Sequence, residues 1–166
     1  MAYRIAQGIQ ISLDGITWYK LSDHNRSPIS ISYESIEHSQ RMANGKMRKY
    51  VIDSKNNVSV KWDVFPTKDA YLVDYSSGAK GAAWLKAFYD ANVFQPIKIK
   101  LTYAKDTVPA QNNVPNAATY VDSYSTTGEI LSVYISDFTY DISKRVSPIG
   151  QTGYDFVDLS ISFVEI

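Results

Sequence analysis

His24 and His38 are the two side chains in this sequence best suited to acid–base catalysis or metal binding near neutral pH. His38 directly follows Glu37, but the sequence contains no pair of histidines at the spacing that places two ligands on one helix face. A metal or catalytic site would therefore need partners from distant parts of the chain. We predict that both histidines lie in solvent, in a loop or at a strand end, and we predict no cofactor.

Carboxylates and glycines give equally weak indications of chemistry. Asp14 and Gly15 stand between two alternating segments, which is typical of a turn rather than of a ligand loop. The other carboxylates considered are Asp53, Asp63, Asp69 and Asp74. Two carboxylates need only meet in space to act on a glycosidic bond, so a β-sandwich hydrolase stays open as a weaker alternative. The stretch from Gly78 to Gly81 lacks the Lys-Ser/Thr ending of a phosphate-binding loop. We predict no catalytic residue and no enzyme.

The most distinctive charged stretch surrounds Asn44 and Gly45, which form the strongest two-residue signal for a tight hairpin turn. Four cations with no compensating acid occur between Arg41 and Tyr50, and a polar break at residues 53–57 follows. The candidate site residues are Arg41, Asn44, Gly45, Lys46, Arg48 and Lys49. They favour contact with an acidic partner, either a neighbouring subunit or a nucleic-acid backbone. The alternative is a solvated hairpin whose cations discourage pairing between sheet edges.

Composition limits the classes to which the chain can belong. It has 166 residues, of which 45% are apolar, 13 are Tyr and none is Cys. This length suits a single domain over residues 1–166, and the Tyr-rich composition favours sheet. The lack of Cys excludes disulfides and thiolate metal sites. Lys plus Arg and Asp plus Glu both number 17, which argues against a general attraction to nucleic acid. We expect a soluble protein made in a cytoplasm, because no apolar run has the length of a membrane span or a signal peptide.

Alternating apolar residues predict about eight β-strands, mostly neighbours in sequence. The clearest are 9–13 and 16–21, joined by a two-residue loop, and then 29–37, 58–65, 97–103, 129–142 and 157–163. In the 58–65 strand we expect Val58, Val60, Trp62 and Val64 to face the core. In the 97–103 strand we expect Lys98 and Lys100 to face solvent. A slip in the 129–142 pattern at Ser136 and Asp137 predicts a β-bulge.

One stretch has a helical period instead. Between residues 79 and 93, Trp84, Phe88 and Ala91 recur at helical spacing, with Ser76 or Ser77 as a candidate N-cap and Asn92 near the end. Residues 104–119 show almost no periodicity and predict a long loop. The expected fold is mainly β: an antiparallel β-sandwich or partly rolled barrel with one flanking α-helix at about residues 79–93.

Four stretches carry a resemblance to a known family. They are RMANGKMRKY (41–50) followed by VSVKWDVFP (58–66); WLKAFYDAN (84–92) leading into QPIKI (95–99); VYISDFTYDISKR (133–145); and YDFVDLSISFVEI (154–166). In order and layout they resemble tail proteins of tailed bacteriophages, of the tail tube and minor tail protein group. The resemblance covers roughly residues 29–166 and lies in layout and short phrases.

That resemblance implies a structural protein of the virion. It implies a β-sandwich that assembles into rings, commonly hexameric, which stack into a hollow tail tube or cap its end. The hairpin at about residues 37–51, or instead the loop at 104–119, would reach the neighbouring subunit or the next ring. Implied partners are copies of the chain, other tail proteins including a tape-measure protein, and DNA in transient passage through the lumen, with no membrane. The implied location is the virion tail, after assembly in the host bacterial cytoplasm.

A second class of function stays open beside the structural one. Trp62, Trp84 and the many Tyr side chains suit either core packing or a platform on which sugars or bases stack. Exposed aromatics beside the loop at residues 104–119 would give a carbohydrate- or receptor-binding β-sandwich module of a virion. Ring or tube formation would favour the structural reading, and a monomer that binds glycans would favour the binding module.

Overall fold

The computed structural model describes residues 8–22, 25–68, 79–102, 129–147, 149–150 and 153–166. Its elements are β1 (Gly8–Ser12), β2 (Tyr19–Lys20), β3 (Ser30–Arg41), β4 (Met47–Pro66), α1 (Ala82–Asn92), β5 (Ile97–Thr102), β6 (Glu129–Val146) and β7 (Tyr154–Glu165). The prediction of a mainly antiparallel β fold with one α-helix is confirmed for these residues. Predictions for His24, Asp69, Asp74, Ser76, Ser77 and the loop at 104–119 lie outside the described residues.

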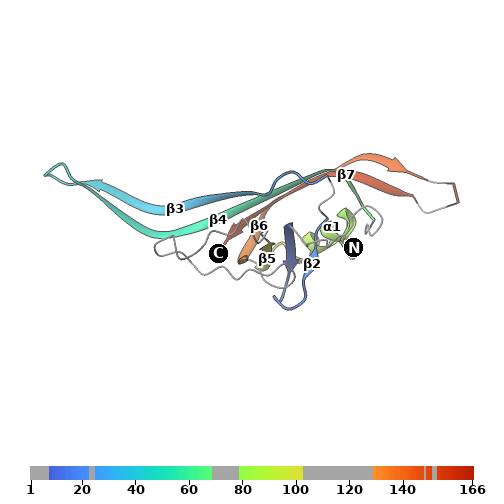
Figure 1. The fold of residues 1–166 in the computed structure, drawn as a ribbon, viewed down its shortest axis with the longest axis horizontal. Coiled ribbons are helices and arrows are strands. Elements are labelled where there is room, and N and C mark those ends of the chain that lie inside the picture. Colours follow the sequence, from blue (N-terminus) through green and yellow to red (C-terminus); the bar gives the residue numbers. More distant parts are fainter. Residues whose placement is uncertain (1–7, 23–24, 69–78, 103–128, 148, 151–152) are drawn as a thin grey trace, which may run out of the picture.

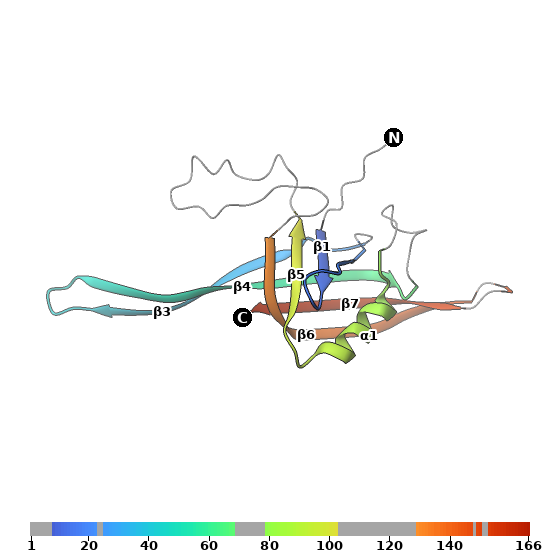
Figure 2. The ribbon, with the colours of Figure 1, turned by 90° about the horizontal axis from the view of Figure 1, so that it is seen from below.

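The seven described strands form one open sheet in the order β2-β1-β5-β6-β7-β4-β3, and all neighbours are antiparallel. β6 joins two parts of the sheet, because its first residues pair with β5 and the others pair with β7. Figure 2 shows that β1, β5 and the start of β6 run across the direction of β7 and β4. Of the two expected architectures the rolled sheet therefore fits, since the strands belong to one bent sheet.

One apolar cluster joins both parts of the sheet. Alternate residues of β4 and β7 are buried as the sequence pattern predicts, because successive side chains of a strand point to opposite faces. The largest fully buried side chains are Trp62, Phe65, Phe163, Ile9, Ile11 and Leu85. The Trp62 indole stacks on Phe65 with ring centroids 5.3 Å apart, and its Nε1–H donates to the Ser22 carbonyl oxygen at 2.7 Å. Trp62 is therefore a core residue and not part of an exposed platform.

The predicted helix forms, three residues later at its start than expected. Gly81 occupies the N-cap position without a side-chain cap, and a Cβ there would collide with the backbone carbonyl of Lys68. Leu85 is buried in the core, and the Tyr89 ring stacks on Phe138 of β6 at 4.4 Å. Asn92 ends the helix as predicted, and its Nδ2 donates to the Phe88 carbonyl oxygen at 2.8 Å. The contacts of Leu85 and Tyr89 hold α1 against the sheet.

The first hairpin forms, but its predicted two-residue loop is wrong. β1 ends at Ser12 and β2 begins only at Tyr19. The Asp14 carboxylate holds a wider turn, because its Oδ1 accepts the backbone N–H of Ile16 at 2.8 Å and of Thr17 at 2.9 Å. These hydrogen bonds lower the pKa of Asp14. Asp14 is thus a turn residue, as the sequence predicts.

The prediction that Lys100 faces solvent is wrong. Its side chain is only 4% exposed, and its Nζ lies 4.2 Å from the centroid of the Trp18 ring. Burial lowers the pKa of the Lys100 ammonium, since a charged amine is less stable away from water. Alternation in β5 places Lys100 on the expected face, but the loop between β1 and β2 covers that face with Trp18. Alternation predicts a direction and not what covers it.

The alternation of β4 also fails at one residue, Val64. It was expected in the core, but it is exposed and adopts a left-handed backbone with φ of 53°. The register between β4 and β7 shifts between Trp62 and Phe65, and the Val64 N–H donates to Asp158 Oδ1 at 3.0 Å. A bulge therefore turns Val64 outward, in a conformation that β-branched residues rarely adopt.

Val64→Gly is expected to raise the free energy of unfolding by about 1 kcal/mol. Removing the side chain relieves about 1–3 kcal/mol of backbone strain, and glycine returns part of that through its larger unfolded-state entropy. The matched control is Val60→Gly, which removes a buried side chain from the same strand and should cost about 3 kcal/mol. Urea denaturation followed by circular dichroism measures both variants. A loss of stability in Val64→Gly would show that this backbone is not strained.

The long strand β6 carries the predicted bulge. Its register with β7 shifts between Ile135 and Asp137, which confirms the slip expected at Ser136 and Asp137. A second shift, between Ile142 and Lys144, was not predicted. The β6–β7 ribbon continues past the last pair of β4 with β7, Pro66 opposite Phe156. Figure 1 shows this ribbon at one end of the molecule and the β3–β4 ribbon at the other.

Candidate assembly surface

The predicted basic hairpin is part of a long two-stranded ribbon formed by β3 and β4 (Figure 1). Backbone pairing extends from Ser30 opposite Ser59 to Arg41 opposite Met47, with one bulge after Ile36. Both strands curve together along the whole ribbon in Figure 1. β3 and β4 therefore form one continuous hairpin at the β3 side of the sheet.

Most of this ribbon has no third strand beside it. β7 pairs with β4 only between residues 57 and 66. We call residues 33–56, which project beyond that pairing, the arm. The hairpin expected at 37–51 lies inside this longer arm. Backbone pairing continues through the polar residues 53–57, so the hairpin and the strand that follows it are one strand, β4.

The tip of the arm turns at Asn44 and Gly45 as predicted, but the turn is wider than the tight turn expected, since β3 ends at Arg41 and β4 begins at Met47. Gly45 has φ of 78°, a left-handed conformation that glycine adopts without steric cost. The Met42 N–H donates to the Lys46 carbonyl oxygen at 2.8 Å, and the Gly45 N–H donates to the Met42 carbonyl oxygen at 2.9 Å. Asn44 Oδ1 accepts the Lys46 N–H at 3.1 Å. Asn44 and Gly45 therefore shape the tip, and the cations flank it.

One of the four cations does have a compensating acid. Lys49 Nζ lies 2.6 Å from Glu37 Oε2, because the register brings the two strands of the arm together there. The hydrogen bond from Lys49 lowers the pKa of Glu37. The other three cations make no ion pair with any residue that the structure describes; they are Arg41, Lys46 and Arg48. The positive charge available to a partner is therefore concentrated at the tip.

The arm also exposes an unusual amount of apolar surface. Seven large apolar or aromatic side chains between residues 33 and 56 are exposed: Tyr33, Ile36, Met42, Met47, Tyr50, Val51 and Ile52. Ile52, at the bulge of the arm, is 77% exposed. A two-stranded ribbon has no core of its own to bury such side chains. The sequence-based prediction considered only the cations of this stretch. It missed the exposed apolar residues between and beside them, which include Met42, Met47, Val51 and Ile52.

The outward face of the arm continues one face of the central strands. The outward face is the side of the sheet that carries Ser59 and Lys61, opposite to the buried Val60. The register carries this face along the arm, where it includes the cross-strand pairs of His38 with Tyr50 and Gln40 with Arg48. The prediction that His38 lies in solvent at a strand end fits this position, near the end of β3.

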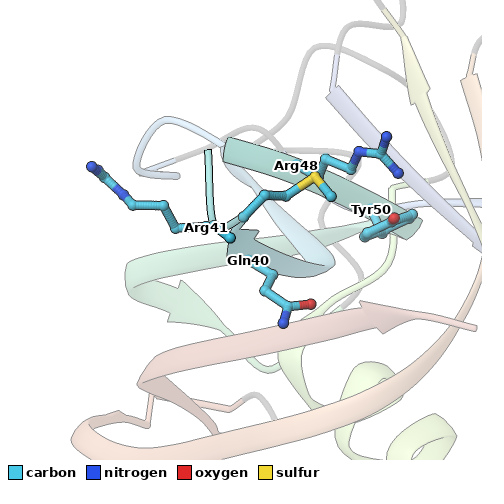
Figure 3. Close-up of a pocket in the computed structure, with 6 residues that line it drawn as sticks. Gln40, Arg41, Arg48 and Tyr50 are labelled. Carbon is cyan, nitrogen blue, oxygen red and sulfur yellow. The ribbon is translucent and has the colours of Figure 1, made fainter. Parts of the chain in front are cut away.

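A shallow hollow lies at the end of the arm (Figure 3). Its volume is about 270 Å³, and its lining is formed by Gln40, Arg41, Met42, Ala43, Arg48 and Tyr50. Figure 3 shows Arg41 and Arg48 extending to opposite sides of it. The hollow thus combines apolar walls from Met42 and Tyr50 with two guanidinium groups, which suits an acidic segment of another protein chain.

The open strand edges of the described sheet include two that can pair with another chain, one on β3 and one on β6. β3 is the last strand, so its outer edge has no strand partner among the described residues. β5 pairs with β6 only as far as Val133, so the same side of β6 is open from residue 134 to residue 146 within the described part of the chain. Open edges present unpaired N–H and C=O groups that can pair with another chain. The arm and the two edges together form the candidate assembly surface.

Carboxylates considered for catalysis occupy structural positions. Asp53 lies 2.8 Å from Lys55 Nζ, and Asp63 lies 3.3 Å from Lys61 Nζ. No group of three or more acidic, His or Cys side chains that could hold a metal occurs in the portion of the chain that the structure describes. No described helix is long and apolar enough to cross a membrane.

Comparison with known proteins finds no matching family model and no matching curated protein. Among solved structures, the chain is similar to one from the tail of an empty GTA particle with C6 symmetry, at 11% identity and a TM-score of 0.48 over 97% of this chain and 91% of that one. It is also similar to the tube-terminating cap of the anti-feeding prophage, at 16% identity and a TM-score of 0.38 over 99% and 89%. Both belong to tail or tube assemblies, the class that the sequence resembles. At such low identities and TM-scores neither similarity determines what this chain binds.

Proposed function

We propose that the chain is a structural protein of a phage tail, which self-associates into closed rings of six copies that form or cap the tail tube. The arm is the observation that carries the proposal. It projects two strands beyond the sheet, exposes seven large apolar side chains and leaves three cations without an ion pair in the described part of the chain. A second copy of the chain covers this surface, and in a closed ring the arm of every subunit is covered in the same way.

The strand directions support a ring. The strands β6, β7, β4 and β3 alternate in direction, so β3 runs antiparallel to β6 of the same copy. A second copy in the same orientation therefore presents its β6 edge antiparallel to the first copy's β3 edge. This contact joins two different surfaces, and each added copy leaves one edge of each kind open until the ring closes. Closure satisfies both edges in every copy.

The outward face of the central strands suits a water-filled lumen. It carries Ser59 and Lys61 of β4 opposite Ser162 and Ser160 of β7. Small hydroxyl side chains make a smooth polar wall. We place the tape-measure protein in this lumen before infection and DNA in transient passage during it, with the assembled ring in the virion tail.

Reversing the arm's charges tests this function. Changing Arg41, Lys46, Arg48 and Lys49 together to Glu is expected to leave the fold intact, because all four side chains lie outside the apolar core. The protein concentration needed for assembly is expected to rise about tenfold or more, because like charges would replace the attractive ones at the contact. Sedimentation and negative-stain electron microscopy measure this. Lys86→Glu, an exposed reversal on α1, is the control.

The wild-type chain should form particles whose mass is an integral multiple of 18.7 kDa, visible as rings or tubes. A strictly monomeric wild-type protein at high concentration would contradict the proposed function. Unchanged ring formation by the fourfold variant would instead remove the basic residues from the contact and leave the ring itself standing.

A further inference from the structure

Glu165, the last residue of β7, contacts the root of the arm. Backbone pairing between β7 and β4 ends at Val164 opposite Asn57, and the neighbouring residue Asn56 already belongs to the arm. Glu165 Oε2 accepts two hydrogen bonds from Asn56, one from its backbone N–H at 2.8 Å and one from its side-chain Nδ2 at 2.7 Å. Hydrogen bonds to a carboxylate are stronger than those between neutral groups. One side chain therefore extends the contact of β7 with the arm past the last backbone pair.

Glu165 is itself fixed within the sheet. It lies opposite Val133 of β6, and Val133 lies opposite Ile97 of β5, so the position belongs to the part of the sheet where β5, β6 and β7 join. The next residue, Ile166, donates its N–H to the Ser132 carbonyl oxygen at 3.0 Å. In Figure 2, β7 ends beside β4 where the arm leaves the sheet. The half-buried carboxylate of Glu165 thus connects the arm to a rigid part of the molecule.

Two further contacts at the root constrain the arm less. Lys55 Nζ donates to the Ile166 backbone oxygen at 2.6 Å, but this bond is exposed to solvent and comes from a long side chain with many rotamers. Asn57 Nδ2 lies 3.4 Å from Glu34 Oε2, which is a long hydrogen bond and joins β4 to β3 rather than to β7. The paired, half-buried hydrogen bonds of Glu165 are therefore the contact best suited to hold the arm in one direction.

A small rotation at the root has a large effect at the tip. With about 3.3 Å per residue, the stretch from Tyr33 to Arg41 spans about 26 Å, so a rotation of about 20° at the root moves the tip by about 9 Å. A projecting pair of strands has little stability of its own to resist such a motion. Restricting the motion before association lowers the entropy that is lost when the arm docks.

We propose that Glu165 is a positioning residue, which fixes the direction in which the arm leaves the sheet and so prepares the arm for contact with a second copy. The direction of the arm is a property of the single chain, whereas its effect on assembly rests on the self-association proposed above. An arm without this contact would sample many directions, and few of them would suit the second copy. A held arm is already oriented, so assembly takes place at a lower protein concentration.

The direction of the arm can be measured in the single chain, because the sequence contains no Cys and two introduced cysteines would be the only labelling sites. Ala43→Cys at the tip and Ala87→Cys on α1 are both exposed and can carry a donor and an acceptor dye. Time-resolved energy transfer at nanomolar concentration should give a narrow distance distribution. Glu165→Val removes the hydrogen-bond acceptor, keeps a strand-forming side chain and should broaden the distribution about twofold or more. An unchanged distribution would overturn the proposal.

An exchange of the two partners tests the contact itself. Asn56→Asp sets two carboxylates against each other and should broaden the distribution as Glu165→Val does. Adding Glu165→Gln to Asn56→Asp again pairs an amide with a carboxylate and should restore most of the narrow distribution. The control is Asp53→Asn, which removes an ion pair within β4 and should leave the distribution unchanged. Equal broadening by Asp53→Asn, or no recovery in the double variant, would overturn the role of Glu165.

Assembly gives the second readout. Glu165→Val is expected to raise the protein concentration at half-assembly about fivefold or more, whereas Asp53→Asn should change it by less than about twofold. A broadened distance distribution with unchanged assembly would overturn the preparation of the arm for contact and leave the proposed function intact. A wild-type protein that stays monomeric would refute the proposed function, while the energy-transfer measurement on the single chain would still decide whether Glu165 directs the arm.

Discussion

Replacing residues 35–54 by Asn-Gly is expected to give a folded subunit that no longer forms rings. Glu34 lies opposite Lys55, so a two-residue type I′ turn between them closes the shortened hairpin in register. No residue of the arm belongs to the apolar core cluster of the described chain, so the thermal midpoint should stay within a few degrees of wild type. Assembly should be lost, because the variant lacks the surface that covers its neighbour. Circular dichroism and sedimentation measure the two effects separately.

The shortened variant should also inhibit ring formation by the wild-type protein when the two are mixed. It keeps the β6 edge, and so it can accept the β3 edge of a neighbouring copy without offering an arm. An assembly that grows through a contact between two different surfaces stops growing at a subunit that lacks one of them. Rings formed by the shortened variant alone, or unfolding of that variant, would each contradict the division of the chain into a core and an assembly arm.

Trp62→Ala is expected to lower the free energy of unfolding by about 3–5 kcal/mol. The Trp62 side chain is 0% exposed, stacks on Phe65 and donates its only N–H to the Ser22 carbonyl oxygen. The substitution leaves a cavity and an unsatisfied carbonyl group, and the loss is a large part of the 5–15 kcal/mol that is typical of a domain. Urea denaturation of the arm-shortened protein measures it without interference from assembly.

Two controls separate core packing from a stacking platform. Trp62→Phe keeps an aromatic ring in the core and should cost less than Trp62→Ala. Trp84→Ala removes a half-buried ring that packs on Tyr19 and Phe88, and it should also cost less. A Trp62→Ala protein whose free energy of unfolding lies within about 1 kcal/mol of wild type would contradict the assignment of Trp62 to the core. It would favour Trp62 as a ligand-stacking residue instead.

Local patterns in the sequence predicted the parts of the fold that depend on near neighbours. Alternation identified Val58, Val60 and Trp62 as core residues, because the side chains of a strand point to opposite faces with a period of two. The slip at Ser136 and Asp137 identified a real bulge. The turn at Asn44 and Gly45 follows from the left-handed backbone that Gly45 adopts. Each of these features is determined within a few residues of the position concerned.

Features that depend on contacts between distant segments could not be predicted from the sequence. The burial of Lys100 requires Trp18 from another hairpin, and the pairing of Lys49 with Glu37 requires the register of the arm. The candidate site was therefore predicted in its charges and its turn, while its length and its exposed apolar residues were not.

A structure of the assembled particle by electron cryo-microscopy tests the central claim most directly. The account predicts a closed ring in which β3 of each copy pairs antiparallel with β6 of the next, and the arm of each copy is covered by another copy. An assembly in which the arms extend into solvent and both strand edges stay unpaired would contradict it.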